Sequence, residues 1–485
     1  MQNSPADSPP GFLNLKSQGA TGLSYFFQFW CYVTPVFGGW LADTYLGKYS
    51  TICWGTGIYV IGILVLFVTS IPSITTQNAA VGGFITSIIL IGIATGLIKA
   101  NLSVLIADQF PKTGPKIITK KNGKKVIEDP NITIQNVFMF FYLMINVGSL
   151  SVIATTELEL HVGFWAAYLL PFCFFWIAVI VLAVGRNQYV KPPIGDKVIS
   201  KCFKVMYIVS KNKFNFDAAK PSYNPEVAFP WSDKFVDEIK RALGACKVFC
   251  FYPIYWVCYG QMLNTFVSVG GTMELHGLPN DFFQAIDSIA LIVFIPICEY
   301  FLYPLIRKFT PLRPITKIFL GFMFGAAAMV WAAVLQHFIY KAGPCYDHPL
   351  SCDTPNRIHV AWQVPAYVLI AFSEIFASIT GLEYAYSKAP VTMKSFIMAL
   401  FLLTNAFGSA LGCAISPVVV DPKFVWMYTG LGVACFIAGW LFWFCFKHYN
   451  KTEEALNAMD YDSDELMLKK LDDSKLEAST SSSSA

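Results

Sequence analysis

Residues 82–107 read GGFITSIILIGIATGLIKANLSVLIA, and this stretch decides the fold of the chain. Its length and apolar composition predict a helix that crosses a lipid bilayer, because about 20 apolar residues span the hydrocarbon layer. Lys99 lies roughly 12 Å along this helix from the charged end at Asp108, near the middle of the layer. A lysine at that depth cannot reach the membrane surface and is unfavourable unless it faces a partner or a wet cavity. Lys99 therefore marks a candidate functional site.

The composition is that of a polytopic membrane protein. The 485 residues are 55% hydrophobic and 14% charged, and the mean hydropathy is +0.52, which is too apolar for a soluble globular domain. The net charge of +4 is modest, and the lysines lie in a few hydrophilic segments. Binding to nucleic acid is therefore unsupported, and we expect lipid headgroups and counterions to meet this charge.

Hydrophobic runs of about 20 residues predict an all-α polytopic membrane protein with about eleven transmembrane helices. The predicted spans are residues 22–42, 51–70, 82–107, 137–156, 163–185, 245–269, 283–305, 315–340, 361–383, 395–415 and 424–446.

The loops between these spans alternate in charge. Lysines and arginines concentrate in every second loop, beginning with the loop after the first span, and the positive-inside rule places those loops in the cytoplasm. The odd number of spans, with about five before the long basic segment and six after it, predicts that one helix is missing at the N-terminus. The predicted organisation is an extracellular leader segment (1–21), an N-terminal bundle (22–185), a cytoplasmic basic linker (186–244), a C-terminal bundle (245–449) and a disordered cytoplasmic tail (450–485).

Glu374 is the counterpart of Lys99 in the other half of the chain. It lies roughly 15 Å from either end of its predicted helix, and a carboxylate there is as unfavourable as the lysine. One interpretation is a structural ion pair, or a polar contact that holds helices together. The other is that the two halves present opposite charges to a shared central cavity, which suits a substrate with a carboxylate and an ammonium group. A buried carboxylate could also take up and release protons.

Residues 38–48, GGWLADTYLGK, indicate a different kind of site. Small residues such as Gly39 and Gly47 let two helices approach closely, while Asp43 and Lys48 can bridge to the end of a neighbouring helix. We interpret this segment as a conformational latch and not as a binding site.

The cysteines and histidines give no sign of an enzyme. Most of the 13 cysteines lie inside hydrophobic spans and are expected to act as small apolar residues. Cys345 and Cys352 share a polar loop and could form a disulfide if that loop faces an oxidising compartment. The sequence contains no phosphate-binding loop, zinc-ligand spacing or Ser/His/Asp arrangement. We therefore expect no catalytic residue, no metal and no cofactor.

Four segments of the sequence together form a highly specific signature. They are residues 38–48, GLIKAN at 96–101, FYLMINVGS at 141–149, and SE at 373–374 leading into TGLEYAYSKAP at 380–390. They resemble the proton-dependent oligopeptide transporter family of the major facilitator superfamily, and most of all its fungal di- and tripeptide permeases. The resemblance covers residues 19–449. It implies a twelve-helix fold in which two six-helix bundles rock about a central site.

The resemblance also implies roles for individual residues. Lys99 would help bind the carboxyl end of a peptide and couple to protons, while Asn146 and Glu374 would meet its amino end. The residues that would line pockets around the peptide are Tyr32, Trp256, Asp287, Phe401 and Asn405.

The chain departs from the family pattern at several points. A Glu-x-x-Glu-Arg pattern is central to proton coupling in the family's first helix, and this chain begins after it. The acid that many relatives carry in helix seven is replaced around Tyr259 and Gln261. Asp287 stands where many members have Asn, and Phe401 where some have Trp. Asp287 also lies near the outer end of its span, so it could simply be solvated there.

The sequence thus predicts a multi-pass, monomeric importer of di- and tripeptides in the plasma membrane. The proton gradient would drive it by alternating access. One alternative is a truncated isoform or peptide sensor that binds without transport. Another is a transporter of the same fold that moves another anion or an amino acid conjugate.

Overall fold

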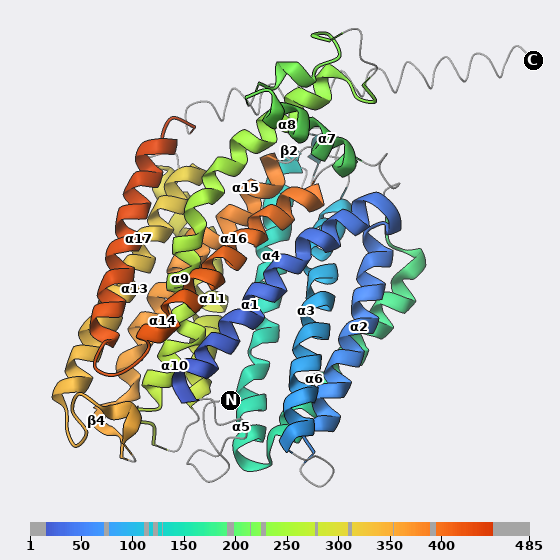
Figure 1. Cartoon of the computed structure of the whole chain (residues 1–485). Helices are drawn as coiled ribbons and strands as arrows, with labels where there is room; N and C mark the ends of the chain where they lie inside the picture. The colour runs from blue at the N-terminus through green and yellow to red at the C-terminus, as the bar shows by residue number, and fades with distance from the viewer. Residues whose placement is uncertain are drawn as a thin grey trace, which may run out of the picture.

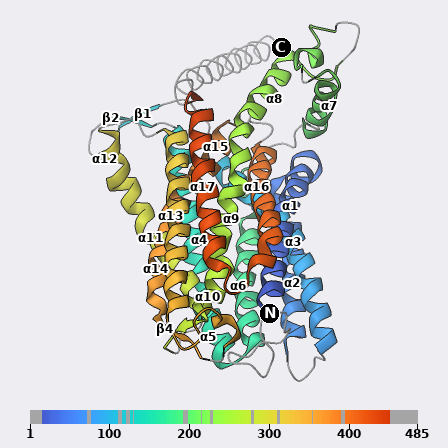
Figure 2. The same ribbon diagram turned by 60° about the vertical axis from the view of Figure 1, so that its left-hand side comes forward.

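The computed structural model describes residues 16–71, 77–110, 116–119, 125–128, 130–191, 198–213, 215–224, 229–276, 280–308, 313–352, 354–388 and 394–449. In this part of the chain, long helices run side by side along one axis, as two views show (Figures 1 and 2). Most of the predicted leader and the whole predicted tail lie outside the described residues. The end of the predicted leader belongs to the first helix, which begins at Lys16.

In the first half of the chain, the described residues form six α-helices. They are α1 (Lys16–Leu41), α2 (Lys48–Thr69), α3 (Gln77–Asp108), α4 (Pro130–Ser149), α5 (Ser151–His161) and α6 (Phe164–Val184). A short antiparallel ladder of β1 (Lys116–Thr119) and β2 (Lys125–Glu128) lies between α3 and α4.

The second half begins with α7 (Val198–Lys211) and α8 (Asp233–Cys246), which lie at the upper end of the molecule in Figure 1. The helices that follow are α9 (Tyr252–Leu263), α10 (Thr265–Gly270), α11 (Gln284–Ile297), α12 (Tyr303–Arg307), α13 (Pro314–Lys341), α14 (Val364–Ser373), α15 (Thr380–Lys388), α16 (Lys394–Ile415) and α17 (Phe424–Phe446). A parallel bridge joins β3 (Met273–Glu274) to β4 (Asn356–His359) at the opposite end of the molecule.

The helical pattern confirms ten of the eleven predicted spans. Ten helical stretches of the described chain are long and apolar enough to cross a membrane, and they match the second to the eleventh predicted span. The first predicted span forms α1, which is not among the ten. In the most apolar 18-residue stretch of residues 164–187, only 6% of the residues are buried inside the protein, whereas 72% are buried in the corresponding stretch of residues 360–387. The helix that carries Glu374 is therefore central, whereas α6 is peripheral.

Three of the long helices contain a π-helical turn. These turns are Ala42–Leu46 after α1, Cys298–Leu302 between α11 and α12, and Glu374–Ile379 between α14 and α15. An inserted residue of this kind changes the direction in which side chains point and is frequent at functional sites. The first of these turns lies in the predicted latch, and the third begins at the candidate site residue Glu374.

Helices α1 and α3 approach closely because Gly38 faces the backbone of Gly96. A Cβ atom on Gly38 would lie 2.3 Å from the carbonyl oxygen of Gly96, and no side-chain movement could relieve this contact. Gly47, at the end of the same segment, has a φ of +73°, a value that favours glycine.

We expect Gly38→Ala to destabilise the fold by about 1–3 kcal/mol, because the added methyl group must push α1 away from α3. The monodisperse fraction after detergent extraction would report this loss. Gly57→Ala is the matched control, since a Cβ at Gly57 in α2 meets nothing within 4 Å. Equal yields from the two variants would contradict this account of the contact.

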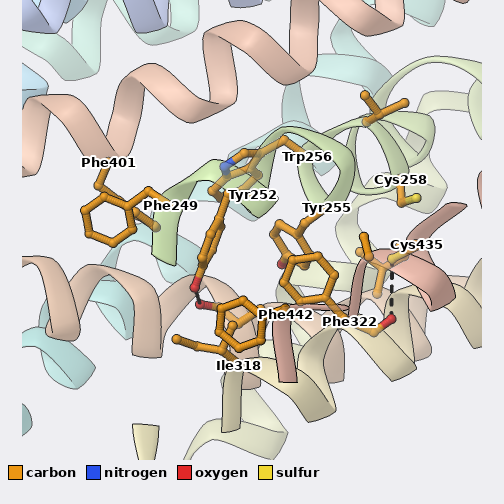
Figure 3. Close-up of a cluster of buried hydrophobic side chains, with 14 of the residues drawn as sticks. Phe249, Tyr252, Tyr255, Trp256, Cys258, Ile318, Phe322, Phe401, Cys435 and Phe442 are labelled. Carbon is orange, nitrogen blue, oxygen red and sulfur yellow. Dashed lines mark hydrogen bonds between the residues drawn. The ribbon is translucent and has the colours of Figure 1, made fainter. Parts of the chain in front are cut away.

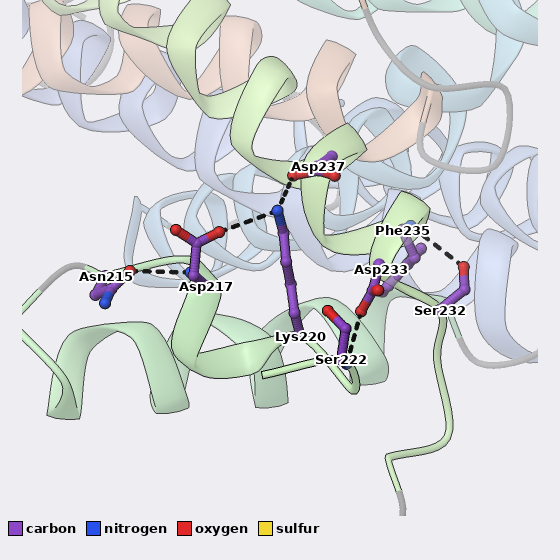
Figure 4. A network of polar contacts seen from close by, with 8 residues as sticks. All are labelled: Asn215, Asp217, Lys220, Ser222, Ser232, Asp233, Phe235 and Asp237. Atoms are coloured by element: carbon purple, nitrogen blue, oxygen red, sulfur yellow. Dashed lines mark hydrogen bonds and ion pairs between the residues drawn. The ribbon is translucent and has the colours of Figure 1, made fainter. Parts of the chain in front are cut away.

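The predicted basic linker contains ordered structure. Lys220 joins two of its parts, since its ammonium lies 3.0 Å from a carboxylate oxygen of Asp217 and 2.8 Å from one of Asp237 on α8 (Figure 4). Helix α8 leads through a 3₁₀ turn into α9, so the predicted boundary at residue 245 falls inside a helix. The linker is thereby tied to the helix that opens the C-terminal half.

This ion pair predicts a pH dependence of the linker. Hydrogen bonding to Lys220 lowers the pKa of Asp217 below its ordinary value of 3.8. A lowered folded-state pKa means that the contact stabilises the linker above the ordinary value and is lost as pH falls through the folded value. We expect amide exchange of residues 215–224, corrected for intrinsic rate, to stay slow at pH 5 and to rise severalfold only below pH 4. In Lys220→Met, exchange of the same amides should be fast both at pH 5 and below pH 4. Equal protection at pH 5 in the wild type and the variant would refute the stabilising role of this contact.

Candidate functional site

Lys99 lies on α3 and faces the aromatic ring of Tyr32 on α1. Its ammonium nitrogen is 3.9 Å from the centre of that ring, which is the geometry of a cation–π interaction. The Lys99 side chain is exposed, and it makes no ion pair with any residue that the structure describes. Lys99 is therefore a cation held by an aromatic face and available to an anion.

Glu374 is buried at the start of the π-helical turn Glu374–Ile379, with 5% of its surface exposed. One of its carboxylate oxygens accepts a hydrogen bond from the hydroxyl of Tyr142 on α4. The same hydroxyl lies 3.3 Å from the Ser378 hydroxyl in the next turn. This contact crosses from the first half of the chain to the second. The other oxygen, Oε2, has no hydrogen-bond partner among the described residues.

Contacts with two neighbouring helices hold the turn that carries Glu374. Ser373 donates a hydrogen bond of 2.7 Å to the carbonyl oxygen of Gly321 on α13, and Tyr252 on α9 donates one of 3.0 Å to the carbonyl oxygen of Ala377. A Cβ atom on Gly321 would lie 2.4 Å from that of Ala377. The position of the Glu374 carboxylate is thus fixed by close packing on both sides.

Asp287 on α11 is buried and not solvated, with 4% of its surface exposed. The expectation that it could simply face water is therefore wrong. Asp287 lies within electrostatic range of Glu374, and its Oδ1 has no hydrogen-bond partner among residues with described positions. Asp287 and Glu374 are thus two buried carboxyl groups of the second half of the molecule that interact electrostatically.

Lys99 and Glu374 do not pair with each other in this structure. The described residues around Glu374 offer it hydroxyl groups and no cation. The structure therefore contains no structural ion pair between Lys99 and Glu374. The hydrogen bond from Tyr142 to Glu374 does connect two helices. The Lys99 side chain is exposed, whereas the Glu374 carboxylate is buried and keeps one oxygen without a partner among the described residues.

The remaining predicted site residues have protein partners. Asn146 donates a hydrogen bond of 2.9 Å to the carbonyl oxygen of Tyr142 in its own helix, and Asn405 lies 3.4 Å from the Ser409 hydroxyl. The indole of Trp256 donates a hydrogen bond of 2.9 Å to the Thr404 hydroxyl.

Phe401 on α16 is buried in a cluster of aromatic rings. Its ring centre lies 5.2 Å from that of Tyr252 and 5.3 Å from that of Phe249 (Figure 3). Trp256 lies in the same cluster, 6.2 Å away. The predicted pocket-lining residues Trp256 and Phe401 thus form one packed layer between α9 and α16.

The predicted latch brings two helix ends together. The ammonium of Lys48 lies 2.5 Å from a carboxylate oxygen of Asp108, at the end of α3, and the Asp108 side chain is only 3% exposed. Gly39 is buried in α1, Asp43 lies in the π-helical turn, and Gly47 separates that turn from α2. Lys48 therefore makes the kind of bridge that the sequence suggests, within the first half of the chain.

Comparison with known proteins decides the family. The model of the POT family matches residues 49–431. The chain belongs to the POT family. It is 71% identical to peptide transporter PTR2 of Saccharomyces cerevisiae over 96% of this chain and 77% of the relative. It is also 67% identical to peptide transporter PTR_C of Candidozyma auris over 96% of this chain and 82% of the relative.

Solved structures support the fold. The chain superposes on a crystal structure of an auto-inhibited POT family peptide transporter with a TM-score of 0.67, 21% identity and 88% of each chain covered. The POT family transporter PepTSo gives a TM-score of 0.68 at 21% identity, with 89% of this chain and 90% of that chain covered. The predicted major facilitator fold is confirmed, and the chain is a multi-pass membrane transporter and not an enzyme.

One contact between the two halves of this POT family chain is not predicted from the sequence. Tyr25 on α1 is 2% exposed, and its ring fits a notch made by Gly260 on α9 and Gly412 on α16. A Cβ on Gly412 would lie 2.5 Å from that ring, and Gln261 donates a hydrogen bond of 2.9 Å to the Tyr25 hydroxyl. One signal was present, since Tyr25 lies two helical turns before Tyr32 and therefore on the same face of α1.

Proposed function

We propose that this chain is a proton-coupled symporter that imports di- and tripeptides across the plasma membrane by alternating access. The observation that carries the proposal is the Tyr142–Glu374 hydrogen bond, because it joins the two halves of the molecule through a buried carboxylate. The POT family match and relatives that are named peptide transporters support the substrate class. The proton gradient supplies the driving force, and no cofactor takes part.

The opposite charges of Lys99 and Glu374 suit the two ends of a peptide. In our proposal Lys99 attracts the peptide carboxylate, and its contact with Tyr32 keeps the ammonium in place. Glu374, with Asn146, meets the peptide amino group, for which the Oε2 atom of Glu374 is available. The residues proposed to surround the peptide are Tyr32, Trp256, Asp287, Phe401 and Asn405.

Proton coupling follows from the same carboxylate. An ionised Glu374 accepts the Tyr142 hydrogen bond and attracts an amino group, whereas a protonated Glu374 has lost its charge and one acceptor site. Binding of a peptide amine and binding of a proton therefore compete at one group. We propose that this competition, together with Lys99, couples proton entry to peptide release, and that the Lys48–Asp108 bridge stabilises one state of the cycle.

The chain is proposed to act as a monomer with two moving bodies. These are the N-terminal bundle (22–185) and the C-terminal bundle (245–449), connected by the cytoplasmic linker (186–244). The disulfide Cys345–Cys352, which the structure forms in a loop next to β4, suits an extracellular position for that end of the molecule.

Uptake of a labelled dipeptide by cells that lack their own peptide transporters tests the proposal. We expect accumulation above the external concentration at acidic external pH and its collapse when an ionophore removes the proton gradient. Free amino acids and nitrate should not compete. Binding without accumulation would instead support the peptide sensor, and competition by nitrate would support a transporter of other anions.

A further inference from the structure

A small cavity lies inside the second half of the molecule, beside α10. Side chains of α10, α13, α14 and α17 line it, together with Gln363, which immediately precedes α14. The cavity offers about 10 Å³ to the centre of a water molecule, which is room for one water. Most of the lining residues are apolar, and the polar ones are Gln336, Gln363 and Tyr428.

Three polar atoms of these lining residues lack a hydrogen-bond partner in the described part of the chain. The Oε1 atoms of Gln336 and Gln363 and the hydroxyl of Tyr428 have no hydrogen-bond partner of ordinary geometry among the described residues, although the Thr265 side chain lies near the Tyr428 hydroxyl. Gln336 and Tyr428 are each 1% exposed, and Gln363 is 3% exposed. Buried polar atoms in folded proteins are normally paired, because an unpaired one loses its interaction with bulk water and gains nothing in return. Three such atoms around one cavity therefore point to a ligand.

We infer that this cavity is a binding site for one ordered water molecule. Water can donate two hydrogen bonds and accept others, and the site presents two acceptors and one donor. Its two protons would go to the Oε1 atoms of Gln336 and Gln363, and its oxygen would accept the Tyr428 hydroxyl proton. The orientation of one amide is fixed, because the Nε2 of Gln363 donates a hydrogen bond of 3.0 Å to the carbonyl oxygen of Phe266.

The position of this site gives the water a role in the contact between the two halves. Phe266 follows Thr265, whose hydroxyl donates a hydrogen bond of 2.8 Å to the Oε1 of Gln261. Gln261 in turn donates to Tyr25 on α1. Because Gln363 bonds to Phe266 on α10, a water bound to Gln363 would connect α10 to Gln336 on α13 and Tyr428 on α17. This connection would help to maintain the hydrogen bond between Gln261 and Tyr25.

The sign of a stability change tests the inference. Tyr428→Phe and Gln336→Met each keep the size of the side chain and remove one polar partner. If a water bridges these groups, each change should lower the unfolding temperature of the purified full chain by about 2 °C, because a hydrogen bond is lost. The double variant should lose less than the sum, since both groups hold the same water. A dry cavity predicts the opposite sign, because each change then removes an unpaired buried polar atom.

Two control variants calibrate the measurement. Tyr49→Phe removes a hydroxyl that donates to the carbonyl oxygen of Leu182 at 2.7 Å, far from the cavity in the first half of the chain, so it reports the loss of one known hydrogen bond. Tyr300→Phe removes a hydroxyl from a side chain that is 75% exposed and should change nothing. A density map that resolves waters should show a peak between the three groups in the wild type and none in the double variant. Raised unfolding temperatures in both single variants, or an empty map at this position, would overturn the inference.

Discussion

Glu374→Gln is expected to abolish the accumulation of a labelled dipeptide while leaving exchange of peptide across the membrane. Glutamine preserves the size of the side chain, and its amide oxygen can still accept the Tyr142 hydrogen bond that joins the two halves. It can neither ionise nor take up a proton. The variant should therefore still move peptide down its gradient, but internal peptide should no longer exceed the external level at acidic pH.

The chain offers a matched control for this variant. Glu299 also lies in a π-helical turn of the second half, Cys298–Leu302, and one of its carboxylate oxygens has no hydrogen-bond partner among the described residues. Glu299→Gln should accumulate peptide normally if coupling belongs to Glu374 alone. Loss of both accumulation and exchange in Glu374→Gln would show that the peptide amine needs the charge of Glu374 to bind at all, in addition to its role in coupling. Normal accumulation by that variant would remove Glu374 from the site.

The sequence sufficed to single out the two charged candidate residues and to place the spans that carry them. Lys99 and Glu374 interrupt long apolar runs, where a charge is costly, so their positions stand out without a structure. The same apolar runs set the helix positions, because a bilayer demands segments of a minimum length. The charged residues and the helix positions can both be inferred from the composition of one segment at a time.

The features that could not be predicted from the sequence depend on contacts between distant segments. The notch for Tyr25 is formed by Gly260 and Gly412, which are far apart in the chain and carry no pattern that pairs them. The burial of Asp287 depends on its neighbours, since its place near the end of a span is equally compatible with water. Helix α8 continues through a 3₁₀ turn into α9. This continuity could not be predicted, because α8 has a polar face whereas α9 is apolar.

The π-helical turn at Glu374 shows the same limit at a finer scale. A one-residue insertion changes which side chains share a helix face, and a regular period of 3.6 residues does not predict it. In the structure, Ser373 and Ala377 receive specific partners from α13 and α9. The direction of the Glu374 carboxylate toward Tyr142 is therefore a property of the packed bundle.

Lys99→Ala is expected to weaken the apparent affinity for dipeptides roughly 30-fold or more. In our proposal the bound peptide covers Lys99, so its ammonium and the peptide carboxylate form a desolvated pair. Removing one member of such a pair typically costs about 2–5 kcal/mol, and about 1.4 kcal/mol corresponds to a tenfold change. The loss should appear for peptides with a free carboxyl end. It should be small for peptides with an amidated end, because they have no carboxylate for the ammonium to meet. The measurement is the concentration dependence of uptake for both kinds of peptide.

Two further variants separate the charge of Lys99 from its contact with α1. Tyr32→Phe keeps an aromatic face under the ammonium, whose nitrogen lies 3.9 Å from the ring centre, and should change affinity little. Lys341→Ala removes an exposed lysine at the end of α13 and should leave uptake unchanged. If Lys99→Ala weakens free and amidated peptides equally, Lys99 acts on the fold or on protons and not on the carboxylate. Unchanged affinity for both would return Lys99 to a structural role, because the ammonium would then meet no part of the substrate.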